Sequence, residues 1–476
     1  MRVAAMNRSG QGQTLLVIGA GIGGYTAAIR AAREGMDVTL LEAGELGGTC
    51  LNVGCIPTKS LLHQAQHYRQ ARAGGLMAFG VDPSTLHLNY EAVSAQKNQV
   101  VNQLVQGVQS LVRRNRITLI RGTAEFLDAH QVRVRETGAL LRADRFVIAT
   151  GSEPIMPALP GIDLPGVVNS DGALALQSLP QRVVILGAGV IGVEFAQIFS
   201  AFGRAVTVLE MQDSVLRQED PDVVAVLVQD LKASGVSIQL NTRVDRIASG
   251  PQHLEVIGQG PDGMGSWPAD LVLVATGRRP RTAGLGLDAL GLQMNQGAIA
   301  TDEFGRTSIP HIYAVGDVRG GWQLAHKAGA EAECSVAHML GNPHSMSALV
   351  IPRAVYTDPQ IAAVGLTEAQ AAAQYERVQV GRFPFSASGK ALVMGQAQGF
   401  IKLIADAQTH QIVGIGMVGP DVTDLLGEAT LAIQMELTLP ALMQSVHAHP
   451  TLSEALMEAA HDAFNRGAIH LPPPST

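Results

Sequence analysis

The stretch LLVIGAGIGGYTAAIRAAREGMDVTLLE, residues 15–42, places a glycine pattern between two short apolar runs. Gly19, Gly21 and Gly24 form Gly-x-Gly-x-x-Gly, a helical stretch follows, and the second apolar run ends at Glu42. In such a unit the glycines serve a tight turn, the close approach of a pyrophosphate, and close packing of helix on strand. The terminal acid can accept hydrogen bonds from both ribose hydroxyls of an adenosine. The stretch therefore predicts a βαβ unit that binds a dinucleotide.

The same pattern returns 168 residues later in VVILGAGVIGVEFAQIFSAFGRAVTVLE, residues 183–210. Its glycines are Gly187, Gly189 and Gly192, and its terminal acid is Glu210. An acid at this position repels a 2′-phosphate, and the next residues, MQD, include no arginine, so we expect the second site to prefer NAD over NADP. Two complete copies predict an α/β protein with two Rossmann-like dinucleotide-binding domains.

A second repeat indicates where the chain crosses between these domains. RFVIATGSEP (145–154) is similar to DLVLVATGRRP (270–280), and in each the sequence Ala-Thr-Gly ends an apolar strand. A strand exit with a small residue and a glycine lets the backbone pass close to a bound nucleotide. Thr150, Gly151 and Gly277 are therefore candidate cofactor-binding residues, and the second dinucleotide-binding domain is inserted into the first.

The first domain resumes after the insertion, in TSIPHIYAVGDVRG (307–320). Asp317 follows an apolar strand at its carboxyl end, where α/β folds bind ligands, and can accept a sugar or ribityl hydroxyl. From about residue 350, strand and helix signals alternate and indicate a mixed α+β domain. We expect a disordered tail at 1–14, a first domain at 15–150 and 278–349, an inserted domain at 151–277, and a C-terminal domain at 350–476.

Charge and composition exclude several classes of partner. The net charge is −7 and no run of lysine or arginine offers a positive surface, so nucleic acid is not an expected partner. The apolar runs are far shorter than the roughly 20 residues that span a bilayer, and the first residues lack a secretory signal. We expect a cytoplasmic protein without a membrane segment, and both Met1 and Met6 are candidate start residues.

Two of the three cysteines lie in GGTCLNVGCIPTK, residues 47–59, for which we consider three interpretations. A metal site would combine Cys50 and Cys55 with His63 and His67. Only seven residues separate Cys55 from His63, against roughly twelve in a zinc finger, and the residues after the second cysteine favour a continuous helix. We therefore expect no metal, and interpret the two histidines as ordinary helix residues.

A structural disulfide is also disfavoured, because the loop is very short and a reducing compartment would not maintain it. A redox centre explains more of the neighbourhood. Pro57 suits the first turn of a helix, whose N-terminus stabilises a nearby thiolate, and Lys59 adds positive charge. The third cysteine, Cys334, is interpreted as buried packing.

Thiol exchange needs a base, and HAHPTLSEALMEAA supplies one near the end of the chain. In this segment His449 is the preferred base, with Glu454 to orient the ring and stabilise its charged form, and His447 ranks second. Thr451 or Ser453 is expected to cap the helix that contains the glutamate.

The glycine patterns, GGTCLNVGCIPTK, YAVGDV and HAHPTLSE together resemble the class I pyridine nucleotide–disulfide oxidoreductases, within them the dihydrolipoyl dehydrogenase branch. The resemblance runs from residue 15 to about 465. It implies a homodimer formed by the C-terminal domain. It also implies FAD on Gly19, Gly21, Gly24, Glu42 and Asp317, and NAD on Gly187, Gly189, Gly192 and Glu210.

In the implied reaction, dihydrolipoamide on a lipoyl domain or carrier protein is reoxidised through a Cys50–Cys55 disulfide, and NAD+ is reduced. Cys50 is the interchange thiol, Cys55 faces the flavin, and Lys59 lies near the flavin and pairs with Glu194. His449 and Glu454 serve the disulfide of the other subunit. Such an enzyme is the shared component of 2-oxo acid dehydrogenase or glycine cleavage complexes.

Two departures and three alternatives accompany this resemblance. Arg281 stands where relatives commonly carry asparagine, and Val190 replaces an aromatic residue of some members, which leaves open how the nicotinamide pocket is covered.

Glutathione reductase-like enzymes would carry basic residues after Glu210, and mercuric reductase-like enzymes would end in paired cysteines. A low-turnover FAD redox sensor would leave the thiol pair and the His449–Glu454 unit without a purpose.

Overall fold

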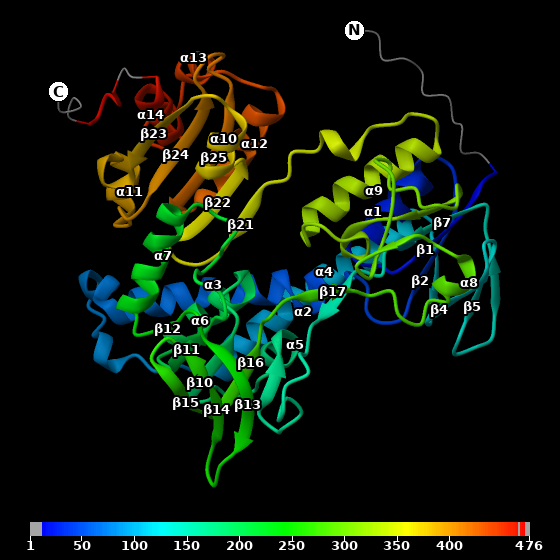
Figure 1. Cartoon of the computed structure of the whole chain (residues 1–476), viewed down its shortest axis with the longest axis horizontal. Coiled ribbons are helices and arrows are strands. Elements are labelled where there is room, and N and C mark those ends of the chain that lie inside the picture. The colour runs from blue at the N-terminus through cyan, green and yellow to red at the C-terminus, as the bar shows by residue number, and fades with distance from the viewer. Residues whose placement is uncertain (1–11, 465–466, 472–476) are drawn as a thin grey trace.

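The first glycine pattern lies on a parallel five-stranded sheet in the computed structural model, which describes residues 12–464 and 467–471 (Figure 1). The strand order is β20-β7-β1-β2-β3. These strands are β20 (Ile312–Ala314), β7 (Arg145–Ile148), β1 (Thr14–Ile18), β2 (Asp37–Glu42) and β3 (Thr118–Arg121). Strand β1 begins at Thr14, inside the range assigned to the tail, and residues 1–11 of that tail lie outside the described part.

The second glycine pattern lies on a sheet with the same spatial order, β12-β11-β10-β16-β9. Its strands are β12 (Ser237–Gln239), β11 (Ala205–Leu209), β10 (Arg182–Leu186), β16 (Leu271–Val274) and β9 (Val167–Asn169). In the first sheet the outermost strand, β20, comes after the inserted segment, whereas its counterpart β9 comes before the glycine pattern of its own sheet. The mixed α/β fold with two Rossmann-like sheets is the fold class that the sequence predicts.

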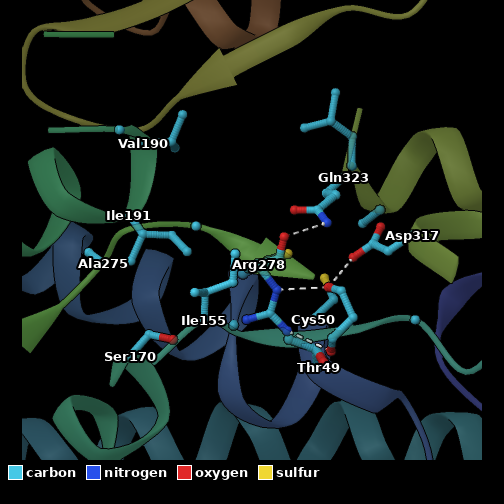
Figure 2. A pocket seen from close by; sticks show the side chains of 18 of the residues that line it. Thr49, Cys50, Ile155, Ser170, Val190, Ile191, Ala275, Arg278, Asp317 and Gln323 are labelled. Atoms are coloured by element: carbon cyan, nitrogen blue, oxygen red, sulfur yellow. Dashed lines mark hydrogen bonds between the residues drawn. The ribbon is translucent and has the colours of Figure 1, made fainter. Parts of the chain in front are cut away.

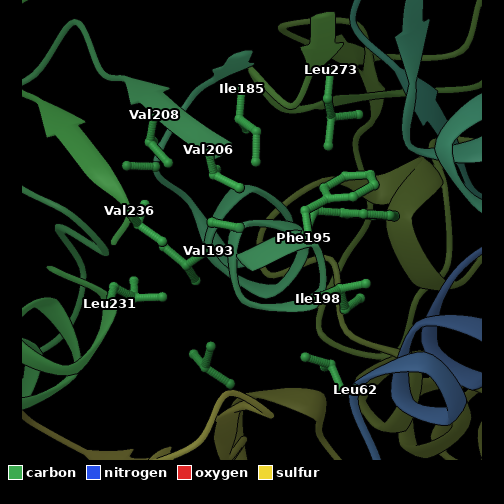
Figure 3. Packing of buried hydrophobic residues seen from close by; sticks show 14 of the residues in the cluster. Leu62, Ile185, Val193, Phe195, Ile198, Val206, Val208, Leu231, Val236 and Leu273 are labelled. Carbon is green, nitrogen blue, oxygen red and sulfur yellow. The ribbon is translucent and has the colours of Figure 1, made fainter. Parts of the chain in front are cut away.

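Burial on both faces explains why the inner strands β1, β7, β10 and β16 are mostly apolar. Helix α1 (Ile22–Arg33) follows β1, and α6 (Val190–Ala201) follows β10. In Figure 3, Phe195 and Ile198 of α6 pack among Ile185, Val206 and Leu273 of the second sheet. Such two-sided cover is the usual state of a parallel sheet.

A two-stranded antiparallel ribbon joins the two domains. Strand β8 (Ser152–Pro154) pairs with β17 (Arg278–Pro280), so the two Ala-Thr-Gly repeats, far apart in sequence, lie side by side. Helices α2 (Gly48–Val53), α3 (Cys55–Gln70) and the long α4 (Tyr90–Arg114) pack on one another.

The C-terminal domain is an antiparallel sheet in the order β21-β22-β25-β24-β23, with helices on it. Its strands are β21 (Arg353–Val355), β22 (Gln360–Gly365), β23 (Val378–Pro384), β24 (Phe400–Asp406) and β25 (Ile412–Gly419). The helices include α10 (Glu368–Gln374), α12 (Leu426–Gln434) and α14 (Glu454–Ala463). The pattern of strands and helices agrees with the predicted α+β domain.

Two antiparallel hairpin sheets were not foreseen by the sequence analysis. They are β4-β5-β6, within residues 124–142, and β13-β14-β15, within residues 243–269. Among the residues that the structure describes, no helix is both long enough and apolar enough to span a bilayer.

Candidate active site

The two glycine turns have the same geometry. Gly19 and Gly187 have φ of +98° and +106°, in the left-handed region that favours glycine. A Cβ on Gly24 would lie 1.8 Å from the Gly19 carbonyl oxygen, and one on Gly192 would lie 2.0 Å from that of Gly187. Both contacts are far below van der Waals distance, so any side chain there would separate the helix from its strand.

The middle glycine of each pattern has open space where a side chain would lie, unlike the first and third glycines. A Cβ on Gly21 would meet no protein atom closer than 3.9 Å, and one on Gly189 would meet none within 4 Å. Both residues line a cavity. The protein therefore leaves space at these positions that its own packing does not need, as expected where a pyrophosphate approaches the backbone.

Each terminal acid closes its own turn. Glu42 Oε2 accepts the Ala20 N–H at 2.5 Å, and its Oε1 accepts the N–H two residues further along the chain at 2.7 Å. Glu210 repeats both contacts, with Ala188 at 2.6 Å and with the N–H two residues later at 2.8 Å. These backbone bonds fix the carboxylates at the cavity wall, and each oxygen keeps a second lone pair for a ribose hydroxyl.

One cavity of about 1640 Å³ connects the two turns and is lined by predicted site residues of both domains. Figure 2 shows the part of its wall that carries Cys50 and Asp317. This volume exceeds the roughly 300–1,000 Å³ of a pocket for one drug-sized ligand. The predicted residues on its wall are Gly19, Gly21, Glu42, Cys50, Cys55, Lys59, Thr150, Gly151, Gly187, Gly189, Glu194, Glu210, Gly277 and Asp317. Gly24 and Gly192 act behind the wall, through helix packing.

The cysteine pair lies at the junction of two helices on this wall. Cys50 is within α2 and Cys55 is the first residue of α3; both are thiols here. Gly48 has φ of +58°, and a Cβ on it would lie 2.6 Å from the Cα of Gly21. The absence of that side chain lets the cysteine helix pack directly on the first glycine turn.

The pKa of Cys55 is lowered to about 7. A hydrogen bond with the Cys50 thiol lowers it most, burial opposes this effect, and the Lys59 ammonium lowers it further. The same hydrogen bond, together with burial, raises the pKa of Cys50. The pair is therefore asymmetric, with Cys55 as the thiol that becomes a thiolate near neutral pH.

Three domains meet at Lys59. Its Nζ lies 2.9 and 2.8 Å from the two carboxylate oxygens of Glu194 on α6, which is the pairing that the family resemblance implies. Glu194 Oε1 also accepts the Tyr356 N–H at 3.0 Å, from the C-terminal domain. Lys59 Nζ lies 4.8 Å from the centre of the Tyr356 ring. The carboxylate is 2 % exposed, so the cation beside the cysteines is fixed rather than mobile.

A second polar chain on the cavity wall was missed by the sequence analysis. Arg278 donates from Nε to Ser152 Oγ at 2.8 Å, and this hydroxyl donates to Asp317 Oδ2 at 2.6 Å. Gln323 donates to the Arg278 carbonyl at 3.2 Å, and Figure 2 shows Arg278, Gln323 and Asp317 near Cys50. The signal for it was present in the two repeats, since Ser152 and Arg278 each directly follow an Ala-Thr-Gly sequence.

The predicted base and its acid lie outside this cavity. His449 Nδ1 and Glu454 Oε1 are 2.9 Å apart, and Figure 1 shows α14, which contains Glu454, well away from α2. The His449 side chain is 76 % exposed, whereas that of the rival His447 is 7 % exposed and lies 2.8 Å from a Glu428 oxygen. His449 is therefore the histidine available to another molecule.

The predicted helix cap in this segment is wrong. Ser453 makes no side-chain capping bond; instead Glu454 Oε2 accepts the Thr451 N–H at 2.7 Å. Although burial alone would raise the pKa of Glu454, this bond and the His449 ring hold it below its usual range. The two oxygens of the Glu454 carboxylate are thus held by two groups of the preceding loop, the His449 ring and the Thr451 N–H.

The remaining singled-out residues have these positions. Val190 is exposed at the start of α6 and lines the cavity. Arg281 also lines the cavity, and its backbone N–H donates to the Gly151 carbonyl. The exposed Trp322 also lines the cavity, with the Arg353 guanidinium 5.3 Å from its ring centre, a contact the sequence did not suggest. Cys334 is buried in α9 (Ala325–Met339).

Two family models match this chain, one over the two dinucleotide-binding domains and one over the C-terminal domain. Residues 13–332 match the family model of the pyridine nucleotide-disulphide oxidoreductases, and residues 351–460 match the model of that family's dimerisation domain. A dihydrolipoyl dehydrogenase of Bacillus subtilis is 40% identical over 448 residues, which are 94% of this chain and 97% of the relative. Dihydrolipoyl dehydrogenase 3 of Pseudomonas aeruginosa is 40% identical over 459 residues, 95% of this chain and 98% of the relative.

Solved structures show the same likeness. The HOCl-induced flavoprotein disulfide reductase RclA of Escherichia coli has a TM-score of 0.85 and 32% sequence identity to this chain. The match covers 94% of this chain and 99% of RclA.

Proposed function

We propose a function from one premise: this chain belongs to the pyridine nucleotide-disulphide oxidoreductase family. It catalyses the dihydrolipoyl dehydrogenase reaction, in which protein-bound dihydrolipoamide and NAD+ give lipoamide, NADH and a proton. The observation that carries this proposal is one cavity that holds a cysteine pair between two glycine turns, each closed by a glutamate. The relatives that are 37–40% identical over nearly the whole chain support the choice of substrate.

The residues present fit FAD on the first turn and NAD on the second. Gly21 and Gly189 leave the backbone open, Glu42 and Glu210 present carboxylates for ribose, and Asp317 lines the same wall. When bound, the flavin supplies the two-electron transfer between a dithiol and the nicotinamide. The acid at Glu210, with no basic residue directly after it, favours NAD over NADP.

The chain's own thiols perform the first half of the reaction. One thiolate of dihydrolipoamide attacks the Cys50 sulfur of the Cys50–Cys55 disulfide, which forms a mixed disulfide and releases the Cys55 thiolate. The second substrate thiol then attacks the mixed disulfide, and oxidised lipoamide leaves with Cys50 reduced. Cys55 is the leaving group favoured by its surroundings, because the Lys59 ammonium lowers its pKa and can stabilise the thiolate as it departs.

The proton released by the substrate dithiol needs a base, and we assign it to His449 of the partner subunit. Within one chain His449 is exposed and does not line the cavity, while the match to a dimerisation domain supports a homodimer. Glu454 holds Nδ1 of the ring, which leaves Nε2 free to accept the proton. The active site is thus complete only when two chains associate.

The test of this function is a substrate comparison on the purified FAD-loaded protein. We expect lipoamide turnover with NADH to exceed turnover with glutathione disulfide by at least about 100-fold, and NADH to be preferred to NADPH. Lipoamide turnover no better than that of other disulfides would assign the chain to another branch of the family. A preference for NADPH would contradict the role of Glu210.

A further inference from the structure

A pair of histidines lies on the solvent-exposed side of α3, the helix that begins at Cys55. His63 and His67 are four residues apart on α3, and both are exposed. Their Nε2 atoms are 3.1 Å apart, and their ring centres are 4.3 Å apart. Side chains at positions i and i+4 of a helix lie on the same face, so both rings point outward together.

This separation fits a metal ion between the two nitrogens. With metal–nitrogen bonds of about 2.05 Å, nitrogens 3.1 Å apart subtend an angle of about 98° at the metal. That angle is close to the roughly 90° between neighbouring ligands of a tetragonal or octahedral ion. The two nitrogens are also hydrogen-bonded to each other at this distance, so a bound metal ion would replace that hydrogen bond.

The helix that carries the pair is held rigidly. Leu61, Leu62 and Ala65, between and beside the histidines, are buried, and Figure 3 shows Leu62 near Ile198 of α6. After His67 the helical backbone continues from α3 into a π-helical turn at Ala71–Gly75. The neighbouring Arg69 is paired with Asp230 and Asp358, so its charge is already balanced.

We propose that His63 and His67 chelate a divalent transition-metal ion, with Cu²⁺ bound more tightly than Ni²⁺ or Zn²⁺. Imidazole is a ligand of all three ions, and Cu²⁺ has the highest affinity in the first-row series. Over residues 12–464 and 467–471, no group of three or more His, Cys, Asp and Glu side chains is arranged to hold a metal. Water therefore fills the other coordination positions.

The experiment is a Cu²⁺ titration of the FAD-loaded protein in its oxidised state, in which Cys50 and Cys55 form a disulfide and do not compete. Electron paramagnetic resonance reports the nitrogen ligands, and competition with a chelator gives the Kd. His63→Ala and His67→Ala are the test variants, and His87→Ala, another exposed histidine, is the matched control.

We expect each test variant to weaken Cu²⁺ binding by at least about tenfold and to lose the signal of one of two imidazole nitrogens, because the second ligand makes binding intramolecular. The control should keep the wild-type Kd. Metal-free lipoamide turnover and flavin content should be unchanged in all three variants.

Two outcomes would overturn the proposal. One is a wild-type Kd and spectrum in His63→Ala or His67→Ala with normal flavin content. The other is an equal loss of binding in His87→Ala, which would indicate only scattered surface coordination.

Discussion

At the scale of single residues, the chemistry depends on the charges around Cys55. Its thiol is at the N-terminus of α3, hydrogen-bonded to Cys50, with Lys59 one helical turn further on. Lys59 is itself held by the buried Glu194, whose charge acts on Cys55 in the opposite direction. The ammonium is thus the nearest charge that favours the thiolate.

We therefore predict that Lys59→Met raises the pKa of Cys55 above about 7, because the cation that lowers it is removed and Glu194 is left unpaired. At pH 7 the reduced variant should contain less thiolate and react more slowly with iodoacetamide. The pH dependence of the alkylation rate gives the pKa. Cys50 is kept in both proteins, although its thiol can also react, because its hydrogen bond contributes to the pKa of Cys55. The alkylation rates of the Lys59→Met variant and the wild-type protein are therefore compared directly.

Two further variants serve as controls for this shift. Lys59→Arg keeps the charge and should keep the pKa near its original value. Lys59→Met combined with Glu194→Gln should recover part of the shift, because the opposing charge is also gone. An unchanged pKa in Lys59→Met would mean that the hydrogen bond from Cys50 alone sets the value.

At the scale of elements, the two turns show that one sequence pattern contains glycines with different purposes. Gly192 is needed for helix packing, since a Cβ there would lie 2.0 Å from a carbonyl oxygen. Gly189 has φ of −74° and an open side, so the fold does not require glycine at that position. The pattern alone does not separate these two roles.

This distinction gives opposite expectations for two alanine variants of the same turn. Gly192→Ala should lower the free energy of unfolding by about 1–3 kcal/mol, through the clash of its Cβ. Gly189→Ala should change that free energy by less than about 1 kcal/mol, yet raise the KM for NAD+ at least about tenfold. Urea unfolding and steady-state kinetics on both variants check this. An unchanged KM in Gly189→Ala would show that the open side of Gly189 is not a ligand surface, and an equal stability loss in both variants would show that the fold itself requires glycine at both positions.

At the scale of the whole molecule, a buried cation joins the inserted domain to the C-terminal one. Lys402 on β24 is 1 % exposed, and its Nζ lies 3.1 Å from Asp220, 2.6 Å from Asp222 and 3.3 Å from Glu368. Asp220 and Asp222 begin α7 (Pro221–Ala233) of the inserted domain. Arg382, which is 45 % exposed, contacts two of the same carboxylates from outside.

We predict that Lys402→Met lowers the free energy of unfolding by about 3–5 kcal/mol, because it leaves the buried Asp220 carboxylate without the cation it faces. Arg382→Met removes a charge from the same cluster, but an exposed one, and should cost at most about 1 kcal/mol. Denaturant titrations compare the two. Similar losses would mean that water reaches Lys402 and screens its charge.

The proposal that two subunits share each active site gives a prediction that can be tested only in an assembled dimer. Cys50→Ser and His449→Ala proteins should each have very low lipoamide turnover. When the two are unfolded and reassembled together, each mixed dimer should contain one intact site, so part of the activity should return. No recovery in proven mixed dimers would show that His449 acts within its own chain or not at all.

The sequence by itself determined the two dinucleotide-binding units, the cysteine pair and the His449–Glu454 unit. These features are local: glycine positions, apolar runs and short spacings act within some thirty residues, and the backbone conformation follows from them. The sequence also indicated the insertion, because the Ala-Thr-Gly repeat marks its two ends.

Only the tertiary structure decided which distant segments meet. β9 and β20 occupy equivalent outer positions although one precedes its glycine pattern and the other follows an insertion. Tyr356 of the C-terminal domain joins the Lys59–Glu194 pair that the family resemblance implied, and Ser152, Arg278 and Asp317 form one polar chain. Such contacts leave no periodic signal, because they are set by how separate hydrophobic cores pack together, and that packing depends on surfaces contributed by the whole chain.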